Sequence, residues 1–171
     1  MTKFEDLGLR QEILTAIAEL GYETPMPVQE QVIPFMLEQS GDLVALAQTG
    51  TGKTAAFGLP TLNKIDVNGG LQAIVIAPTR ELAVQSQEEL FRFGRDKGVK
   101  VRSVFGGASI DKQIKALKSG AHVVVGTPGR MVDLIKRRAL QLGDIETLIL
   151  DEADEMLNMG FYEDIVNILS T

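Results

Sequence analysis

The sequence predicts an α/β fold, with a mostly parallel sheet and helices on both faces. Four short apolar runs have the length and the valine and isoleucine content of buried strands: Ala73–Ala77, Val101–Phe105, His122–Val125 and Thr147–Leu150. Three segments with helical periodicity separate these runs: Glu81–Arg95, Ile110–Lys118 and Arg130–Lys136. Strands that alternate with helices form crossover units, which place parallel strands in one sheet.

Two helices and a further strand are expected before these units. Apolar residues recur at helical spacing across Leu9–Leu20, and Gly21 ends that helix. Pro27 begins a second helix, which Pro34 is expected to kink or cut short. The apolar run Leu43–Leu46 then predicts a buried strand that leads into a glycine-rich turn.

Length and composition narrow the class of protein. The 171 residues suffice for one domain, residues 1–171, and the 44% hydrophobic and 23% charged content is typical of a soluble globular chain. The absence of cysteine and the single histidine exclude disulfides, a thiol nucleophile and a cysteine or histidine metal cluster. No signal peptide and no apolar run of membrane-spanning length is present, so we expect a cytoplasmic location.

The net charge of −6, from 17 basic and 23 acidic residues, disfavours nucleic-acid binding through overall charge. Any such contact must come from a local basic face and should be weak.

Residues 47–54, Ala-Gln-Thr-Gly-Thr-Gly-Lys-Thr, follow the predicted strand and open a helix. Glycines let backbone N–H groups converge on phosphates, and a helix N-terminus adds partial positive charge. The pattern is that of a P-loop, although Ala47 stands where glycine is usual. Lys53 would reach the β- and γ-phosphates and Thr54 would bind Mg²⁺, while the preceding residues of the turn would cradle the nucleotide: Gln48, Thr49, Gly50, Thr51 and Gly52. The alternative is a glycine-rich turn without a ligand.

The box Asp151-Glu152-Ala153-Asp154 follows the predicted strand Thr147–Leu150. Ligands of parallel sheets bind at the carboxyl ends of the strands. Asp151 would hold Mg²⁺, and Glu152 would orient or deprotonate the attacking water. The alternative is an acidic helix N-terminus that the helix dipole favours.

Four further blocks resemble motifs of the DEAD-box RNA helicases, in that family's order. Residues 21–29 resemble the Q motif, with Phe4 upstream as the isolated aromatic, and residues 78–83 resemble motif Ia. Residues 106–107 match the glycine pair, and residues 127–130 match motif Ib. The resemblance extends from Phe4 to at least Phe161. It implies a RecA-like P-loop domain that binds ATP and Mg²⁺ within an RNA-dependent ATPase and helicase.

The resemblance also implies roles for single residues. Gln29 would hydrogen-bond the adenine edge, since an amide offers both donors and an acceptor, and Phe4 and Tyr22 would pack against the base. The RNA backbone would be held without sequence preference by Arg80, Gly107, Thr127 and Arg130. By itself, Gln29 would be a solvated helix residue, and residues 127–130 would be a helix cap with proline at its first position.

Other prominent residues receive structural interpretations. His122 is expected to begin a strand, and Met156 and Met159 are expected to fill core space. Two basic groups are expected to be solvated: Lys112, Lys115 and Lys118 on one helix, and Lys136–Arg138.

Two parts of the family pattern are absent from the chain: the Ser-Ala-Thr motif III and the second RecA-like domain with its arginine fingers. We therefore expect the 171 residues to bind nucleotide, to hydrolyse it negligibly and to unwind nothing. Without the motif III strand the sheet would be destabilised or would exchange a strand with another copy. Two alternatives stay open: another P-loop enzyme, such as a DNA translocase or small-molecule kinase, and a non-catalytic, nucleotide-gated binding module.

Overall fold

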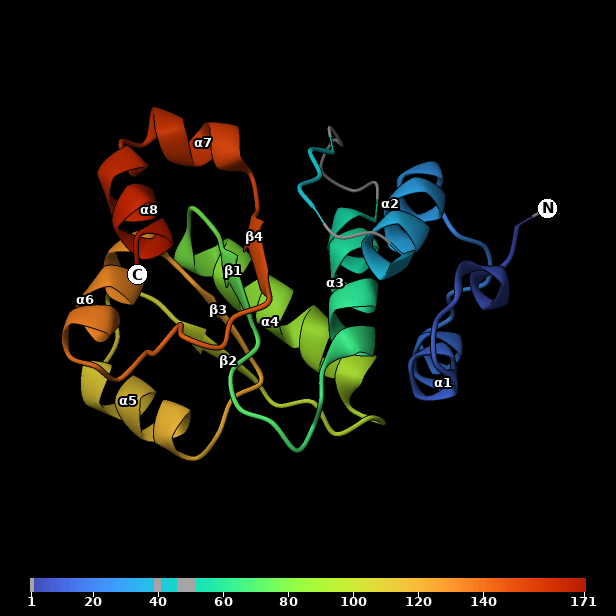
Figure 1. The fold of residues 1–171 in the computed structure, drawn as a ribbon, viewed down its shortest axis with the longest axis horizontal. Helices are drawn as coiled ribbons and strands as arrows, with labels where there is room; N and C mark the ends of the chain where they lie inside the picture. Colours follow the sequence, from blue (N-terminus) through green and yellow to red (C-terminus); the bar gives the residue numbers. More distant parts are fainter. Residues whose placement is uncertain (1, 39–40, 46–51) are drawn as a thin grey trace. The chain divides into compact units, whose positions relative to one another are not determined.

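The computed structural model describes residues 2–38, 41–45 and 52–171 (Figure 1). The chain divides into two compact units, each with its own internal contacts. The helical unit comprises residues 1–66 and 89–99, and the sheet unit comprises residues 67–88 and 100–171. Helix α4, Arg80–Gly94, contributes its first part to the sheet unit and its last part to the helical unit.

In its described residues, the helical unit has four elements before α4. They are the 3₁₀ turn η1 (Phe4–Leu7) and the helices α1 (Gln11–Glu19), α2 (Pro27–Glu38) and α3 (Lys53–Lys64). Both helices expected before residue 40 are confirmed. Pro34 lies inside α2, which continues to Glu38, so of the two expected effects the proline does not cut the helix short, and a kink remains a prediction. The carbonyl that loses its helical partner to Pro34 belongs to Glu30, an exposed residue where water can replace the missing N–H.

The expected strand Leu43–Leu46 is wrong for the three residues that the structure describes. Residues 43–45 form no strand and are exposed, with Val44 at 86% of its full accessibility. Leu46 lies outside the described residues. A strand is stable only beside another strand, and none of the four strands in the sheet takes residues 43–45 as a partner. An apolar run alone was therefore not enough to predict a strand.

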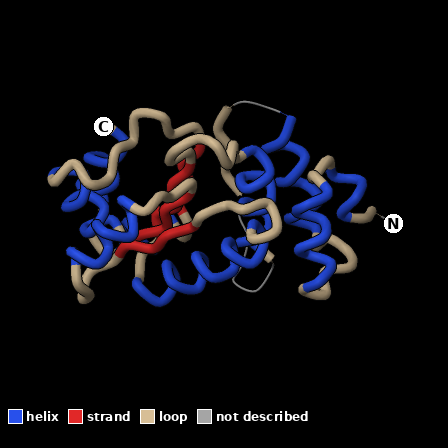
Figure 2. Tube along the Cα trace, turned by 90° about the horizontal axis from the view of Figure 1, so that it is seen from below, coloured by secondary structure: helices blue, strands red, loops and turns tan. Residues whose placement is uncertain are grey.

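The sheet unit contains four parallel strands, drawn in red in Figure 2. They are β1 (Ala73–Ile76), β2 (Val101–Val104), β3 (Val123–Gly126) and β4 (Thr147–Leu150). Their order in the sheet is β2-β3-β1-β4. All four expected strands are confirmed, and so is the α/β class. Central β1 and β3 consist of buried residues, as strands covered on both faces should.

One face of the sheet carries the main core of this unit. Four further helices follow the strands: α5 (Ile110–Lys118), α6 (Pro128–Lys136), α7 (Ala153–Asn158) and α8 (Tyr162–Leu169). Alternate strand residues such as Ile74, Val104 and Val124 form one buried cluster with Met131 of α6 and Met156 of α7. Met156 thus fills the core as expected. Met159 does not, because it follows the last residue of α7 and is 45% exposed.

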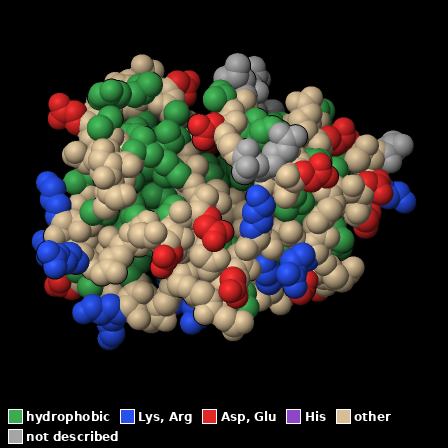
Figure 3. All heavy atoms as spheres, viewed as in Figure 1, with side chains coloured by type: hydrophobic (Ala, Val, Ile, Leu, Met, Phe, Trp, Pro, Cys, Tyr) green, Lys and Arg blue, Asp and Glu red, His purple; other side chains and the backbone are tan. Residues whose placement is uncertain are grey.

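Strand β4 lies at the edge of the sheet. Within the described part of the chain it pairs with β1 alone. Leu148 and Leu150 on this strand are among the exposed large hydrophobic residues. Figure 3 shows hydrophobic side chains gathered on the face of this unit beside β4 and α7. Separately, none of the described helices has the length and apolarity to span a bilayer.

Candidate nucleotide and RNA sites

Helix α3 begins at Lys53, directly after the phosphate-binding turn that the sequence predicts. Gly52 precedes the helix with a left-handed backbone, φ 76°, a conformation that favours glycine. Lys53 and Thr54 are partly exposed in the first turn of this twelve-residue helix. The helix N-terminus presents N–H groups and partial positive charge, which suit a phosphate. The expected contacts at Gln48–Thr51 lie outside the described residues.

Gln29 lies beside this helix start, and its side chain is only 2% exposed. Its Oε1 accepts a hydrogen bond from the Met26 N–H (2.9 Å), and its Nε2 donates to the Gly52 carbonyl (3.1 Å). A Cβ on Gly52 would collide with the Gln29 amide and would lie 2.9 Å from the Met26 sulfur. The structure therefore joins the Q-motif glutamine to the start of the P-loop helix. The interpretation of Gln29 as a solvated helix residue is wrong.

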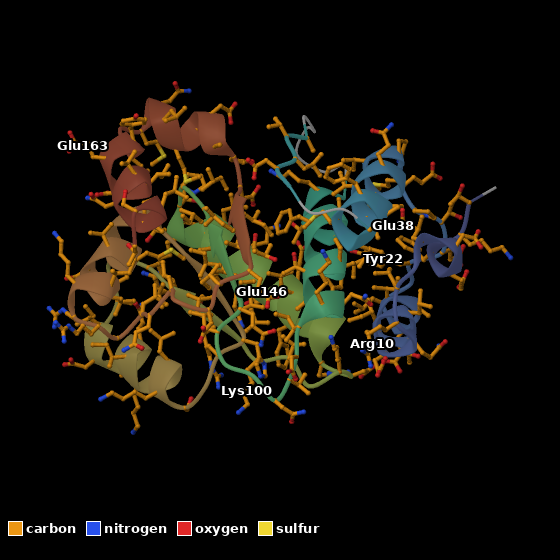
Figure 4. The ribbon with its side chains drawn as sticks, viewed as in Figure 1. Arg10, Tyr22, Glu38, Lys100, Glu146 and Glu163 are labelled. Atoms are coloured by element: carbon orange, nitrogen blue, oxygen red, sulfur yellow. The ribbon has the colours of Figure 1, made fainter. Side chains whose placement is uncertain are left out.

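The two aromatic residues expected near the base lie together in the helical unit. Phe4 is 2% exposed, and its ring centroid lies 6.1 Å from that of Tyr22. Tyr22 contacts Phe93 edge-on at 5.7 Å and is visible beside α2 in Figure 4. Burial, and then the Glu89 carboxylate, raises the pKa of the Tyr22 phenol. In this conformation the rings pack against protein, and their contact with a base remains a prediction.

The acidic box lies at the carboxyl end of β4. Asp151 follows the strand, is 3% exposed, and its N–H donates to the Ile76 carbonyl at 2.9 Å. Glu152 has a left-handed backbone, φ 52° and ψ 53°, which costs about 1–3 kcal/mol in a residue with a side chain. Such strain is concentrated at functional sites, and here it turns the chain between β4 and α7. A buried carboxylate at this edge suits a cation.

Mg²⁺ usually keeps several waters and binds one or two carboxylates together with the phosphates of a nucleotide. No group of three acidic or histidine side chains among the described residues could form a metal cage. Asp151 in the sheet unit and Thr54 in the helical unit each carry an oxygen of the kind that Mg²⁺ binds, and their joint role at one metal remains a prediction.

Three of the four residues expected to hold RNA lie around the loop that follows β2. The Arg80 guanidinium lies 4.8 Å from the centroid of the Phe105 ring, and a Cβ on Gly107 would lie 3.7 Å from Arg80 Nη1. Arg130 Nη1 donates to the carbonyl of Ala108 in the same loop at 3.2 Å. Arg80 and Gly107 are exposed and Arg130 is half-buried. The structure thus brings two arginines to one glycine-containing loop.

Thr127, the fourth residue, connects β3 to α6. Its N–H donates to the Val104 carbonyl (3.1 Å), and Pro128 starts the helix. No hydrogen bond from a described N–H to the Thr127 side chain caps α6. Gly126 just before it allows a close approach, because a Cβ there would lie 2.5 Å from Val104 Cγ2 and 2.9 Å from Met131 Cε. Thr127 therefore has the backbone position of a helix cap, but its hydroxyl accepts no capping hydrogen bond from the described N–H groups.

The sequence did not indicate the contacts of three polar residues, Gln113, His122 and Lys97. Gln113 is buried on α5, and the apolar pattern of that helix could have revealed a polar residue at an inward position. His122 does not begin β3 but precedes it: its Nδ1 accepts from the Lys100 N–H (2.9 Å), and its Nε2 lies 3.0 Å from the Val67 carbonyl. Lys97 Nζ donates to three carbonyls at the end of α3.

The basic groups expected to be solvated are exposed, which confirms that interpretation. They are Lys112, Lys115 and Lys118 on α5 and Lys136–Arg138 at the end of α6.

Comparison with known proteins identifies the family. The model of the DEAD/DEAH box helicase family matches residues 26–171, so the chain belongs to this family. It is 70% identical over 169 residues to the DEAD-box ATP-dependent RNA helicase CshA of Streptococcus pneumoniae, covering 98% of this chain and 32% of that protein. It is 54% identical over 171 residues to CshA of Geobacillus kaustophilus, covering 99% of this chain and 36% of that protein.

A solved structure shows the same fold. The crystal structure of a DEAD box protein from the hyperthermophile Methanococcus jannaschii matches with a TM-score of 0.95 and 46% identity. The match covers 99% of this chain and 47% of that one. The chain spans about a third of the length of the curated relatives it matches. The resemblance inferred from the motifs and the RecA-like α/β class are both confirmed.

Proposed function

We propose that this chain is the N-terminal ATP-binding domain of an ATP-dependent RNA helicase that locally unwinds or remodels RNA. The observation that carries the proposal is the buried Gln29 amide, which bonds to Gly52 at the start of the P-loop helix. An amide beside a phosphate-binding turn is placed to sense the base of a nucleotide whose phosphates lie at the helix N-terminus. The relatives named as ATP-dependent RNA helicases support the same assignment.

The proposed roles follow from charge and position. Lys53 binds the β- and γ-phosphates, and the backbone of the preceding turn cradles them. The Thr54 hydroxyl and the buried Asp151 carboxylate hold Mg²⁺. When bound, Mg²⁺ neutralises phosphate charge and aligns the phosphoryl group. Glu152 orients the attacking water and accepts its proton.

RNA is proposed to lie against the loop after β2. Arg80 and Arg130 pair with phosphates, Gly107 lets the backbone come close, and Thr127 offers a hydroxyl and an amide. These groups recognise phosphates and 2′-hydroxyls rather than bases, so binding does not depend on sequence. The net charge of −6 keeps the affinity of these 171 residues for RNA low.

Turnover and unwinding are proposed to need a second RecA-like domain in the full-length protein. An arginine supplied from such a domain to the γ-phosphate is worth about 10³–10⁵ in rate. Residues 1–171 by themselves would then bind nucleotide but hydrolyse it negligibly. A turnover assay with and without the remainder of the protein tests this, and equal rates contradict it.

A nucleotide titration tests the base assignment. Fluorescent ADP and GDP are titrated against the chain and against Gln29→Ala. The matched control is Gln31→Ala, because Gln31 lies on the same helix and is exposed. We expect adenine preference in the parent and in the control, and its loss in Gln29→Ala. Equal binding of both nucleotides by the parent would contradict the assignment of Gln29.

A second experiment tests the water-activating role in the full-length protein. Glu152→Gln keeps the size of the side chain and removes its basicity. We expect ATP affinity to persist while RNA-stimulated turnover falls by at least about a hundredfold. Unchanged turnover removes Glu152 from this role.

A further inference from the structure

Gln113 on α5 makes a pair of hydrogen bonds to the backbone of Phe105. Its Nε2 donates to the Phe105 carbonyl (3.0 Å), and its Oε1 accepts from the Phe105 N–H (3.3 Å). Gln113 is only 8% exposed, and both bonds are part-buried. The amide therefore fixes the first residue after β2 much as a neighbouring strand would. At the other end of the loop, Ser109 caps α5 by accepting from the Lys112 N–H.

The same side chain also holds Arg130. Arg130 Nη1 lies 2.9 Å from Gln113 Oε1 and 3.2 Å from the Ala108 carbonyl. Both acceptors are neutral, so they orient the guanidinium without cancelling its charge. The group also carries donors on Nε and Nη2, the edge that can pair with a phosphate.

Arg80 is connected to Gln113 through Phe105. The Phe105 ring lies under the Arg80 guanidinium, with its centroid 4.8 Å from Cζ. Because Gln113 holds the Phe105 backbone, it also restrains the Phe105 ring, against which the Arg80 guanidinium packs. One buried amide is thus connected to both arginines, to Arg130 directly and to Arg80 through Phe105 (Figure 1 shows α5 and α6 beside β2 and β3).

We propose that Gln113 is a positioning residue for RNA binding: it holds the loop at residues 105–108 and the Arg130 side chain in the geometry that receives the phosphates. This inference rests on the RNA-binding role proposed above. It assigns to Gln113 no contact with RNA.

A neutral amide is required in this position. Glutamate would keep an acceptor for Arg130 but would lose the donor to the Phe105 carbonyl. Its negative charge would also pair with Arg130 and compete with phosphate. Methionine would keep the volume and lose all three hydrogen bonds, the two to Phe105 and the one from Arg130. The two substitutions should therefore weaken RNA binding for different reasons.

The test measures RNA affinity of the full-length protein by fluorescence anisotropy, with a labelled single-stranded RNA at several KCl concentrations. We expect Gln113→Met to weaken RNA binding about tenfold, as for the loss of a hydrogen bond to a charged group. Gln113→Glu should weaken it at least as much and reduce the salt slope by about one phosphate contact. ADP affinity, measured in parallel, should not change.

The matched control is Gln87→Met. Gln87 on α4 also uses its amide to hold β2, since its Nε2 donates to the Val101 carbonyl (3.0 Å) at the opposite end of that strand. If the role of Gln113 is purely structural, Gln113→Met and Gln87→Met should lose RNA affinity in the same proportion to their loss of thermal stability. That result would overturn the proposal.

A double-mutant cycle with Arg130→Met separates the proposal from the function on which it rests. If Gln113 acts largely through Arg130, Gln113→Met should cost clearly less RNA affinity in the Arg130→Met background than in the parent. Full additivity overturns the positioning of Arg130 by Gln113 and leaves the RNA role of this face standing. If Arg130→Met leaves RNA affinity unchanged, the RNA role of this face is wrong, and the proposal for Gln113 is wrong with it.

Discussion

The Nε2 of Gln29 lies 3.1 Å from the carbonyl oxygen of Gly52, and this hydrogen bond joins α2 to the residue that caps α3. The Oε1 of the same amide is bonded to the Met26 N–H. Recognition of a base by Gln29 must therefore share or replace bonds that also hold the start of the P-loop helix. If Gln29 recognises the base as proposed, base identity and the geometry of the phosphate site are coupled through this one side chain.

Gly52→Ala tests this contact. Alanine would need the left-handed backbone, at about 1–2 kcal/mol, and its Cβ would collide with the Gln29 amide. Gly21→Ala is the control, because Gly21 is also left-handed, φ 89°, but has nothing within 4 Å of a Cβ. In denaturant unfolding we expect Gly52→Ala to lose more stability than the control, and to lose ADP affinity as well. Equal losses of stability with ADP affinity intact would contradict the coupling.

Lys97→Met tests what holds the other end of the P-loop helix. Lys97 Nζ lies 2.9, 2.7 and 2.6 Å from the carbonyl oxygens of Leu62, Asn63 and Ile65. Loss of the ammonium removes one donor from each of these carbonyls, of which Leu62 keeps the Ile65 N–H (3.3 Å), and we expect the free energy of unfolding to fall by about 1–3 kcal/mol. Lys100→Met, at an exposed lysine, should cost less than about 0.5 kcal/mol. Equal stability of the two variants would contradict the capping role.

Ionisation of the Tyr22 phenol should lower the free energy of unfolding at alkaline pH. Burial raises its pKa above the ordinary 10.0, so the folded state keeps the phenol proton where the unfolded state has released it. The folded state then binds more protons, and stability falls as pH rises above 10.0. In Tyr162→Phe, Tyr22 is the sole tyrosine, and its ionisation can be followed by absorbance. A midpoint in the folded chain at or below that of the urea-unfolded chain would contradict the prediction.

The edge of β4 should promote self-association of residues 1–171. The strand pairs on one side among the described residues and exposes Leu148, and an apolar open edge invites another strand. We expect concentration-dependent association in light scattering, reduced in Leu148→Lys. Leu169→Lys, at the exposed last residue of α8, is the control and should change association less. A monomer at every concentration would contradict the expectation of strand exchange.

The sequence alone determined the four strands, α5 and the family. Runs such as residues 73–77 and 122–125 are short, β-branched and bounded by helical segments, a combination typical of strands that helices cover on both faces. The family was recognisable because each motif is a local string whose order along the chain carries the information. None of these inferences needed to know which residues meet in space.

Only the tertiary structure decided the features that depend on contacts with another part of the chain. Residues 43–45 have the apolar character of a strand, yet they form none among the described residues, because a strand exists through bonds to its neighbours. The burial of Gln29 and the links from Gln113 to Phe105 and Arg130 join residues 8 to 23 positions apart. A local sequence pattern does not indicate how far apart such residues lie in space. Their roles became visible only when the fold brought donor and acceptor together.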